Sequence, residues 1–118
     1  MQAQHKLVCV NVSDTWDPSA GSLDNYRNVL GFWRLDTQKA NTYDYICAVY
    51  NGAVCEVYEA TQWVEVDEAS FGPFSDGKSR SQWHGKLAPN NVRNLYVGQT
   101  VTGTQGGRYI EPGDDLTA

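Results

Sequence analysis

One hairpin decides this fold: Tyr45-Ile46-Cys47-Ala48-Val49-Tyr50-Asn51-Gly52-Ala53-Val54-Cys55-Glu56-Val57-Tyr58. Asn and Gly both tolerate positive φ, so Asn51-Gly52 suits a two-residue type I′ turn between two strands. This turn predicts a register in which Tyr50 faces Ala53, Val49 faces Val54, Ala48 faces Cys55 and Ile46 faces Val57. Both faces of the first strand are apolar, which is typical of a central strand that is covered on both sides.

Shorter elements are predicted on both sides of the hairpin. Before it we expect a strand over residues 6–12, a helix over 22–30 with Ser22 as its cap, a short strand over 32–35 and one helical turn within 36–42. After it, the second arm continues through 62–66 beyond a bend at 60–61, and an exposed loop spans 67–81. A strand over 83–87, a helix over 90–95 opened by Pro89, and a final strand or loop over 97–101 complete the order. This order predicts an α+β fold with a small curved antiparallel or mixed sheet and two short helices.

Length and composition indicate one globular domain over residues 1–118. Hydrophobic residues make up 41% of the 118, enough for a single core. We expect an ordered core over 6–110 and a frayed tail over 111–118. The net charge of −5 disfavours a surface coated with phosphate contacts, so any contact with nucleic acid must be local. Residues 1–5 lack the apolar region of a signal peptide and no apolar run approaches membrane-spanning length, so a cytoplasmic location without membrane contact is expected.

Cysteine and histidine positions favour neither a disulfide nor a metal site. The predicted register places Cys47 and Cys55 on opposite faces of the sheet, so with Cys9 they are expected to be free thiols. His5 and His84 stand at no ligand spacing to a cysteine, and a nucleophile elbow is absent from the sequence. We therefore expect no metal, no cofactor, no catalytic residues and no enzymatic activity.

Gly72 to Ser79 (G-P-F-S-D-G-K-S) matches the phosphate-loop pattern letter for letter. A phosphate loop needs a helix after it, and Gly85 and Pro89 cut that segment short. Pro73 also removes one of the amides that such a loop uses. The pattern therefore favours an exposed loop, and a Mg²⁺-dependent nucleotide hydrolase using Lys78 and Ser79 stays a third hypothesis.

Aromatic residues next to arginines give the main functional signal. Trp33 precedes Arg34, Arg80 lies near Trp83, and Arg108 ends the glycine-rich segment 102–108. An aromatic plane beside a guanidinium group can stack a base and hold a phosphate, although a single Trp more often only packs a core. We predict a pocket in which Trp33 stacks a base and Arg34 and Arg80 contact phosphate or a base edge. Gln105 and Arg108 are expected to cover the ligand from a mobile loop.

Several short patterns carry a family resemblance over about residues 22–101. They are G-F-W-R-L-D at 31–36, Ala40, the hairpin from Asp44 to Tyr58, Trp63, Arg80, Gly85, Ala88 and V-R-N-L-Y-V-G at 92–98. Together they resemble a small bacterial and phage domain that accompanies LEM-3-like GIY-YIG nucleases. The nuclease half has no counterpart here, so the resemblance implies no catalysis, and Tyr96-Val97-Gly98 alone is a weak match to its signature. Ser81 stands where that pattern often has Trp after Arg.

The strand order and hairpin are also similar to those of the PUA-like group (PUA, ASCH and EVE domains). These are small barrels that bind RNA or modified bases in an aromatic-lined pocket, so the resemblance implies a PUA-like β-barrel with two short helices. The leading hypothesis is a non-enzymatic binding module for a nucleotide or an unpaired or modified base. The alternative is a phage anti-defence or protein-interaction factor, which would sequester a nucleotide signal or present an acidic surface to a host protein. The small size and acidic charge favour this alternative.

Overall fold

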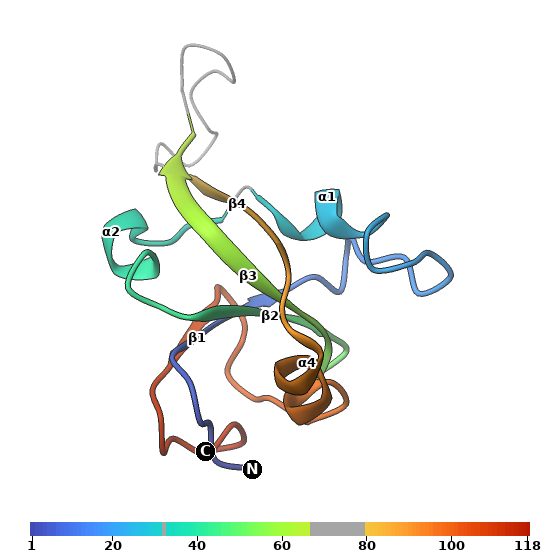
Figure 1. The fold of residues 1–118 in the computed structure, drawn as a ribbon, viewed down its shortest axis with the longest axis vertical. Coiled ribbons are helices and arrows are strands. Elements are labelled where there is room, and N and C mark those ends of the chain that lie inside the picture. Colours follow the sequence, from blue (N-terminus) through green and yellow to red (C-terminus); the bar gives the residue numbers. More distant parts are fainter. Residues whose placement is uncertain (32, 67–79) are drawn as a thin grey trace.

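The computed structural model describes residues 1–31, 33–66 and 80–118, which form one five-stranded sheet and three short helices (Figure 1). The strands follow the order β4-β3-β2-β1-β5, with β1 and β2 parallel and the other neighbours antiparallel. The elements are β1 (Leu7–Asn11), α1 (Tyr26–Val29), α2 (Thr37–Ala40), β2 (Tyr45–Tyr50), β3 (Ala53–Glu65), β4 (Ser81–Leu87), α4 (Asn90–Tyr96) and β5 (Arg108–Ile110). The predicted α+β class with a mixed sheet is confirmed. The sheet of the described residues is not closed into a barrel, and it carries three helices rather than two.

The hairpin turn forms as predicted, and β2 is the middle strand of the sheet. Asn51 and Gly52 have φ values of 50° and 82°, as a type I′ turn requires. Tyr50 pairs with Ala53 and Val49 with Val54, but the register then shifts. Ala48 pairs with Glu56 and Ile46 with Tyr58, so the predicted pairs Ala48–Cys55 and Ile46–Val57 are wrong. The cause is a β-bulge, in which Cys55 is the extra residue.

This bulge changes which side chains of β3 share a face. Val54 and Val57 lie in one hydrophobic cluster with Cys47, whereas Cys55 and Tyr58 contact the other. One cluster joins the sheet to α4 and to both chain ends, and the second lies beneath α1 and α2. Cys47 and Cys55 are therefore on opposite faces, as predicted, and all three cysteines are free. The central strand is covered on both sides, as its apolar faces indicated.

Two predicted elements near the N-terminal half are shorter than expected. The helix predicted over 22–30 is reduced to α1, because the Ser22 hydroxyl donates to the Glu56 carboxylate instead of capping a helix. The strand predicted over 32–35 is only an isolated bridge between Trp33 and Ser81. The single turn of α2 is confirmed and is capped by Asp36, whose side chain accepts a hydrogen bond from the Lys39 N–H. Pro89 directly precedes α4, as predicted.

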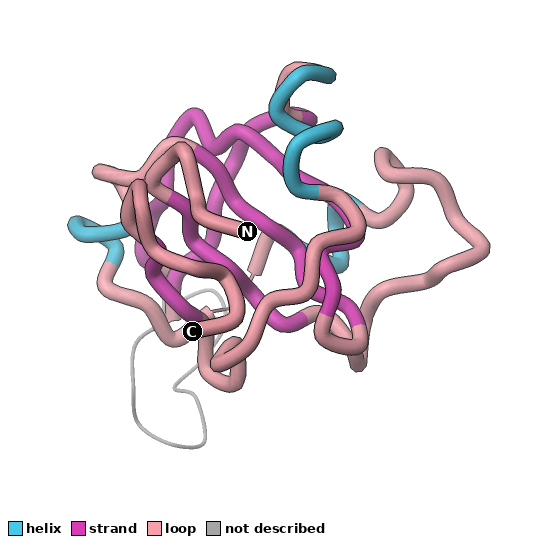
Figure 2. Tube along the Cα trace, turned by 90° about the horizontal axis from the view of Figure 1, so that it is seen from below, coloured by secondary structure: helices cyan, strands magenta, loops and turns pink. Residues whose placement is uncertain are grey.

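The C-terminal segment packs against the N-terminus, so the prediction of a frayed tail is wrong. Leu116 is 1% exposed, and its N–H donates to the Met1 carbonyl at 2.9 Å. Gln2 forms a β-bridge with Asp115, and the two chain ends lie close together (Figures 1 and 2). The tail thereby covers one face of the sheet, beside β5, a strand that the sequence pattern did not predict. None of the helices in the described part has the length and apolar character needed to cross a membrane.

Candidate functional site

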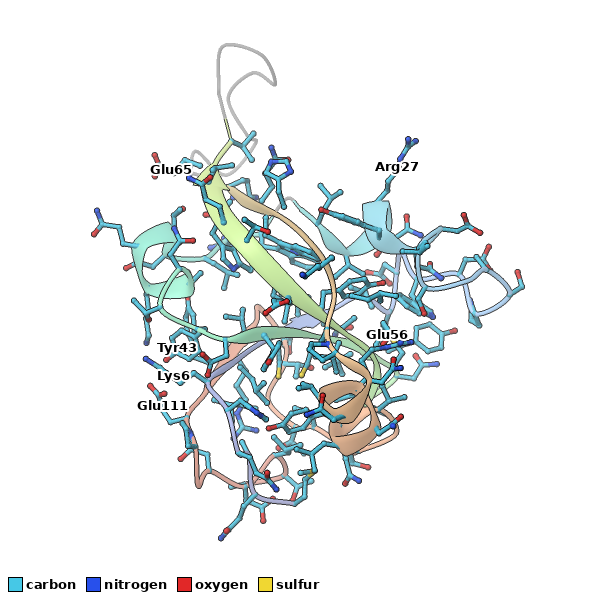
Figure 3. The ribbon with its side chains drawn as sticks, in the orientation of Figure 1. Lys6, Arg27, Tyr43, Glu56, Glu65 and Glu111 are labelled. Atoms are coloured by element: carbon cyan, nitrogen blue, oxygen red, sulfur yellow. The ribbon has the colours of Figure 1, made fainter. Side chains whose placement is uncertain are left out.

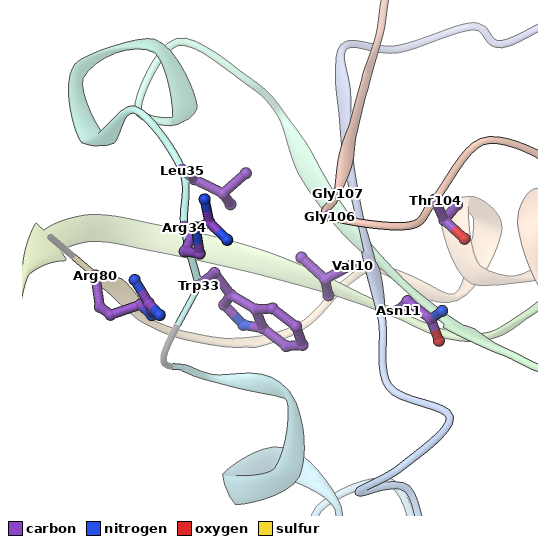
Figure 4. Close-up of a pocket in the computed structure, with 9 residues that line it drawn as sticks. All are labelled: Val10, Asn11, Trp33, Arg34, Leu35, Arg80, Thr104, Gly106 and Gly107. Carbon is purple, nitrogen blue, oxygen red and sulfur yellow. The ribbon is translucent and has the colours of Figure 1, made fainter. Parts of the chain in front are cut away.

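A cavity of about 260 Å³ opens on the α1–α2 side of the sheet. Four segments line it: Val10 and Asn11 at the end of β1, the stretch from Trp33 to Leu35, Arg80 before β4, and Thr104, Gly106 and Gly107 of the loop before β5 (Figure 4). These segments are far apart in the sequence. The sheet brings them together because β1 lies in its interior while Trp33 bridges to the start of β4.

Trp33 is held in a fixed orientation at the wall of this cavity. Its backbone N–H donates to the Ser81 carbonyl at 2.8 Å, and its own carbonyl accepts from the Ser81 N–H at 2.7 Å. The indole N–H donates to the Val29 carbonyl at 2.7 Å. These three bonds fix both the backbone and the ring, so one part of the half-buried indole remains available to the cavity. A preoriented ring loses little conformational entropy when it stacks on a ligand.

Arg34 and Arg80 bring two positive charges to the same wall as Trp33 (Figure 4). Arg34 is exposed and Arg80 is half-buried. A guanidinium group offers five N–H donors in a planar fork that matches phosphate oxygens or the acceptor edge of a base. The wall therefore combines an aromatic plane with donors for anionic or polar groups.

The loop from Thr104 to Gly107 forms the opposite side of the cavity. Gly106 and Gly107 have φ values of 79° and 89°, and a Cβ at Gly107 would lie 3.1 Å from Leu35 Cδ2. The loop can approach Leu35 this closely because residue 107 has no side chain. The Gly107 N–H donates to the Thr104 carbonyl at 2.9 Å, which makes a tight turn at this edge.

Three of the five predicted site residues meet at the cavity. Trp33, Arg34 and Arg80 line it, whereas Gln105 is exposed and is not part of the described lining. The Arg108 guanidinium donates to the carbonyls of Thr102, Leu116 and Asp115 at 2.8–3.1 Å. Arg108 therefore links the loop to the C-terminal segment. It is not among the described residues that line the cavity.

Asn11 lines the cavity although the sequence did not predict it there, and Ser81 is buried beside the segments that carry the arginines. The Asn11 Oδ1 accepts from the N–H and the hydroxyl of Ser13, so its Nδ2 is the part of the amide suited to donate toward a ligand. Ser81 is 1% exposed and its hydroxyl donates to the Leu35 carbonyl at 3.0 Å. It also lies 2.5 Å from the Thr37 hydroxyl. A buried hydroxyl thus joins the two segments that carry the arginines. Only the alternation along β1 could have pointed to Asn11.

A second polar cluster lies apart from the cavity, around the buried Glu56. Arg93 of α4 donates to both carboxylate oxygens at 2.7 and 2.9 Å, and the Ser22 hydroxyl and the Val57 N–H also donate to it. Burial alone would raise the pKa of Glu56, but these hydrogen bonds and the Arg93 charge outweigh it and lower the pKa below 4.5. The bulge pairs Glu56 with Ala48 of β2. This cluster anchors α4 and the loop at Ser22 to the sheet.

The remaining sequence motifs contribute no group to the described lining. The phosphate-loop match at Gly72–Ser79, with Lys78 and Ser79, falls outside the described residues. Tyr96 is buried, and its hydroxyl accepts from the Gln4 N–H at 3.0 Å and lies 2.7 Å from His5 Nδ1. Among the described residues no group of three or more His, Cys, Asp or Glu side chains is placed to hold a metal ion.

The chain was compared with protein families, curated proteins and solved structures. No family model, no curated protein and no solved structure matches the chain. The function therefore has to be inferred from the geometry of the cavity itself.

Proposed function

We propose that this protein is a non-enzymatic binding module that holds a nucleotide, or an unpaired or modified base, in the Trp33 cavity. The observation that carries the proposal is the convergence of Trp33, Arg34 and Arg80 on one cavity from separate parts of the chain. Aromatic stacking combined with guanidinium contacts is the usual way in which proteins hold an unstacked base and its phosphate.

Each wall of the cavity has a role in this proposal. A base stacks on the Trp33 indole, and Arg34 and Arg80 contact its phosphate or its acceptor edge. The Asn11 amide donates to a base edge from the β1 side. The turn at Gly106-Gly107 closes the opposite side, with Gln105 at its exposed tip. These groups bind and orient a ligand, so no chemical step is assigned to them.

Titration of tryptophan fluorescence with nucleosides, nucleoside monophosphates and short oligonucleotides tests the proposal. Base stacking on an aromatic side chain contributes about 1–3 kcal/mol, so Trp33→Ala is expected to weaken binding about 5- to 150-fold. Arg34→Gln and Arg80→Gln are expected to weaken binding of the phosphorylated ligands more than that of nucleosides, because each removes a charged donor.

Trp16→Ala is the matched control. Trp16 is also half-buried and contacts the same hydrophobic cluster, but it does not belong to the described lining. It should leave affinity unchanged at similar stability, which thermal unfolding of each variant checks. The proposal is wrong if no nucleoside, nucleotide or oligonucleotide binds the wild-type protein. It is also wrong if Trp33→Ala and Trp16→Ala lower affinity equally. Recovery of a stoichiometric protein partner free of nucleotide would instead favour the interaction-factor hypothesis.

A further inference from the structure

Two lysines and two tyrosines form a connected cluster on the surface next to the cavity. The Lys39 ammonium lies 4.3 Å from the centre of the Tyr109 ring, and the Lys6 ammonium lies 4.6 Å from that of Tyr43. The two tyrosine rings are 5.0 Å apart, so the four side chains form a row in the order Lys39, Tyr109, Tyr43, Lys6. We call this row the lysine–tyrosine ladder. Figure 3 shows its Lys6 and Tyr43 end below α2.

The ladder begins where the cavity ends. Leu35 lines the cavity, and the Tyr109 hydroxyl donates to the carbonyl of the next residue, Asp36, at 3.4 Å. Gly107, on the opposite wall, lies two residues before Tyr109 in the chain. Leu35 and the two tyrosines all contact the hydrophobic cluster on the cavity side of the sheet. Leu35 and Asp36 thus connect the wall of the cavity with the Tyr109 end of the ladder.

Four basic side chains lie at the cavity or in the ladder. The chain has nine basic residues, and four of them, Arg34, Arg80, Lys39 and Lys6, lie at the cavity or in the ladder. Among the described residues neither ladder lysine has a carboxylate within 4 Å. Three carboxylates at the ladder accept hydrogen bonds from other groups: Glu111 from the Tyr43 hydroxyl, Asp44 from the Lys6 backbone N–H and Asp36 from the Lys39 backbone N–H. The ladder thus carries two ammonium groups that form no ion pair with a described carboxylate, beside carboxylates that accept hydrogen bonds from other donors.

The size of the cavity limits how much of a ligand it can enclose. Pockets that enclose a drug-sized ligand span about 300–1,000 Å³, and this one, at about 260 Å³, is sized for a single base. A lysine lying over an exposed ring gains only about 0.5–1 kcal/mol. A phosphate can therefore draw the ammonium away and uncover the ring for a neighbouring base, since stacking contributes about 1–3 kcal/mol.

We infer that the ladder is a second subsite for the nucleotides next to the base in the cavity, so that the ligand is a single-stranded nucleic acid rather than a free nucleotide. Lys6 and Lys39 contact the backbone phosphates, and the two tyrosines stack flanking bases. This inference rests on the proposed function, because the cavity supplies the first base site.

Affinity as a function of chain length tests the inference. The probes are the four nucleoside 5′-monophosphates and fluorescein-labelled hexanucleotides of each base, in deoxyribose and ribose series, measured by calorimetry and anisotropy. We expect hexanucleotides to bind at least about ten-fold more tightly than monophosphates. The double variant Lys6→Gln/Lys39→Gln should remove most of that gain, reduce the salt slope by about 1.4, and leave monophosphate affinity unchanged. Comparison of the two series shows whether DNA or RNA is preferred.

Lys86→Gln is the control, because it removes the same charge from an exposed lysine of β4 that pairs with Glu59 at 3.8 Å. Lys39→Glu, a single charge reversal, gives a second reading should the double variant be unstable. The inference is overturned, with the proposed function intact, if monophosphates and hexanucleotides bind equally or if Lys86→Gln has the same effect as the double variant. It is also overturned if hexaglutamate competes as well as a hexanucleotide, which would indicate a site for acidic peptides. If none of the nucleotide probes binds, the proposed function and the inference both fail.

Discussion

At the scale of single residues, Glu56 shows how a buried charge is stabilised in this fold. Its side chain is 4% exposed, yet its carboxylate receives four hydrogen bonds, two of them from Arg93. A buried charge without such partners costs several kcal/mol. The donors come from the loop at Ser22, from α4 and from the backbone of β3, so one carboxylate joins three separate segments.

Replacing Glu56 with Gln should therefore lower the free energy of unfolding by about 2–4 kcal/mol at neutral pH. Because the pKa of Glu56 is lowered in the folded protein, its contribution is fully present above the ordinary value of 4.5. The contribution is lost as the pH falls through the lowered folded-state pKa. Urea unfolding of both proteins between pH 7 and pH 2 should show a stability difference that is constant at first and then shrinks.

Glu59→Gln is the control for this prediction, since Glu59 belongs to the same strand. It pairs with Lys86 at 3.8 Å on the surface, where an ion pair contributes about 1 kcal/mol or less. Equal losses for Glu56→Gln and Glu59→Gln would contradict the assigned role of the buried cluster.

At the scale of elements, two glycines on either side of β3 have different functions. Gly52 in the hairpin turn has a φ of 82°, and no atom lies within 4 Å of the place that a Cβ would occupy there. At Gly85 in β4, a Cβ would lie 2.0 Å from the Glu59 carbonyl oxygen and 2.9 Å from the Ala60 Cα. The first glycine is needed for its backbone conformation, and the second because β3 and β4 approach closely where their register shifts.

Alanine at these two positions should separate the two effects. Gly52→Ala places an L-residue in the left-handed region and should cost about 1–2 kcal/mol. Gly85→Ala forces backbone atoms of two paired strands apart and should cost about 3 kcal/mol or more, beyond ordinary overpacking. Urea unfolding midpoints measure both. A milder effect of Gly85→Ala than of Gly52→Ala would show that β4 can shift freely, contrary to this geometry.

At the scale of the whole molecule, the C-terminal segment completes the core. Leu116 lies in the same hydrophobic cluster as Val92 and Tyr96 of α4, and Arg108 binds the carbonyls of Leu116 and Asp115. The segment therefore connects β5, the cavity loop and the N-terminus into one packed unit. Contacts of this kind stabilise the loop that forms one side of the cavity.

Leu116→Ala should destabilise the protein by about 2–5 kcal/mol, the usual cost of a large-to-small change in a core. Leu23→Ala is the matched control, because Leu23 is 73% exposed and a surface change of this type alters stability by about 0.5 kcal/mol or less. Thermal unfolding checks both variants. Similar melting temperatures for Leu116→Ala and Leu23→Ala would show that Leu116 does not stabilise the core. The C-terminal segment would then be frayed, as the sequence predicted.

The sequence alone determined the features that depend on neighbouring residues. Asn51-Gly52 specified the turn, the two apolar faces of β2 indicated a central strand, and Pro89 marked the start of α4. Turn chemistry, capping and side-chain alternation act over a few residues, so they can be read from a local pattern. Trp33 and Arg34 are neighbours in the sequence, so this pair could also be recognised from a local pattern. Both residues line one wall of the cavity.

Only the tertiary structure decided the features that depend on distant partners. These include the bulge at Cys55, the parallel pairing of β1 with β2, the buried tail and the meeting of Trp33 with Arg80 and the loop before β5. The bond between Ser81 and Leu35 joins residues 46 positions apart, and that between Gln4 and Tyr96 joins residues 92 apart. The free energy of such pairs depends on how the whole chain packs, because many residues could satisfy the same local pattern. Hence the sequence could predict that Trp33 and Arg80 belong to a binding site. The cavity that they share forms only through long-range packing.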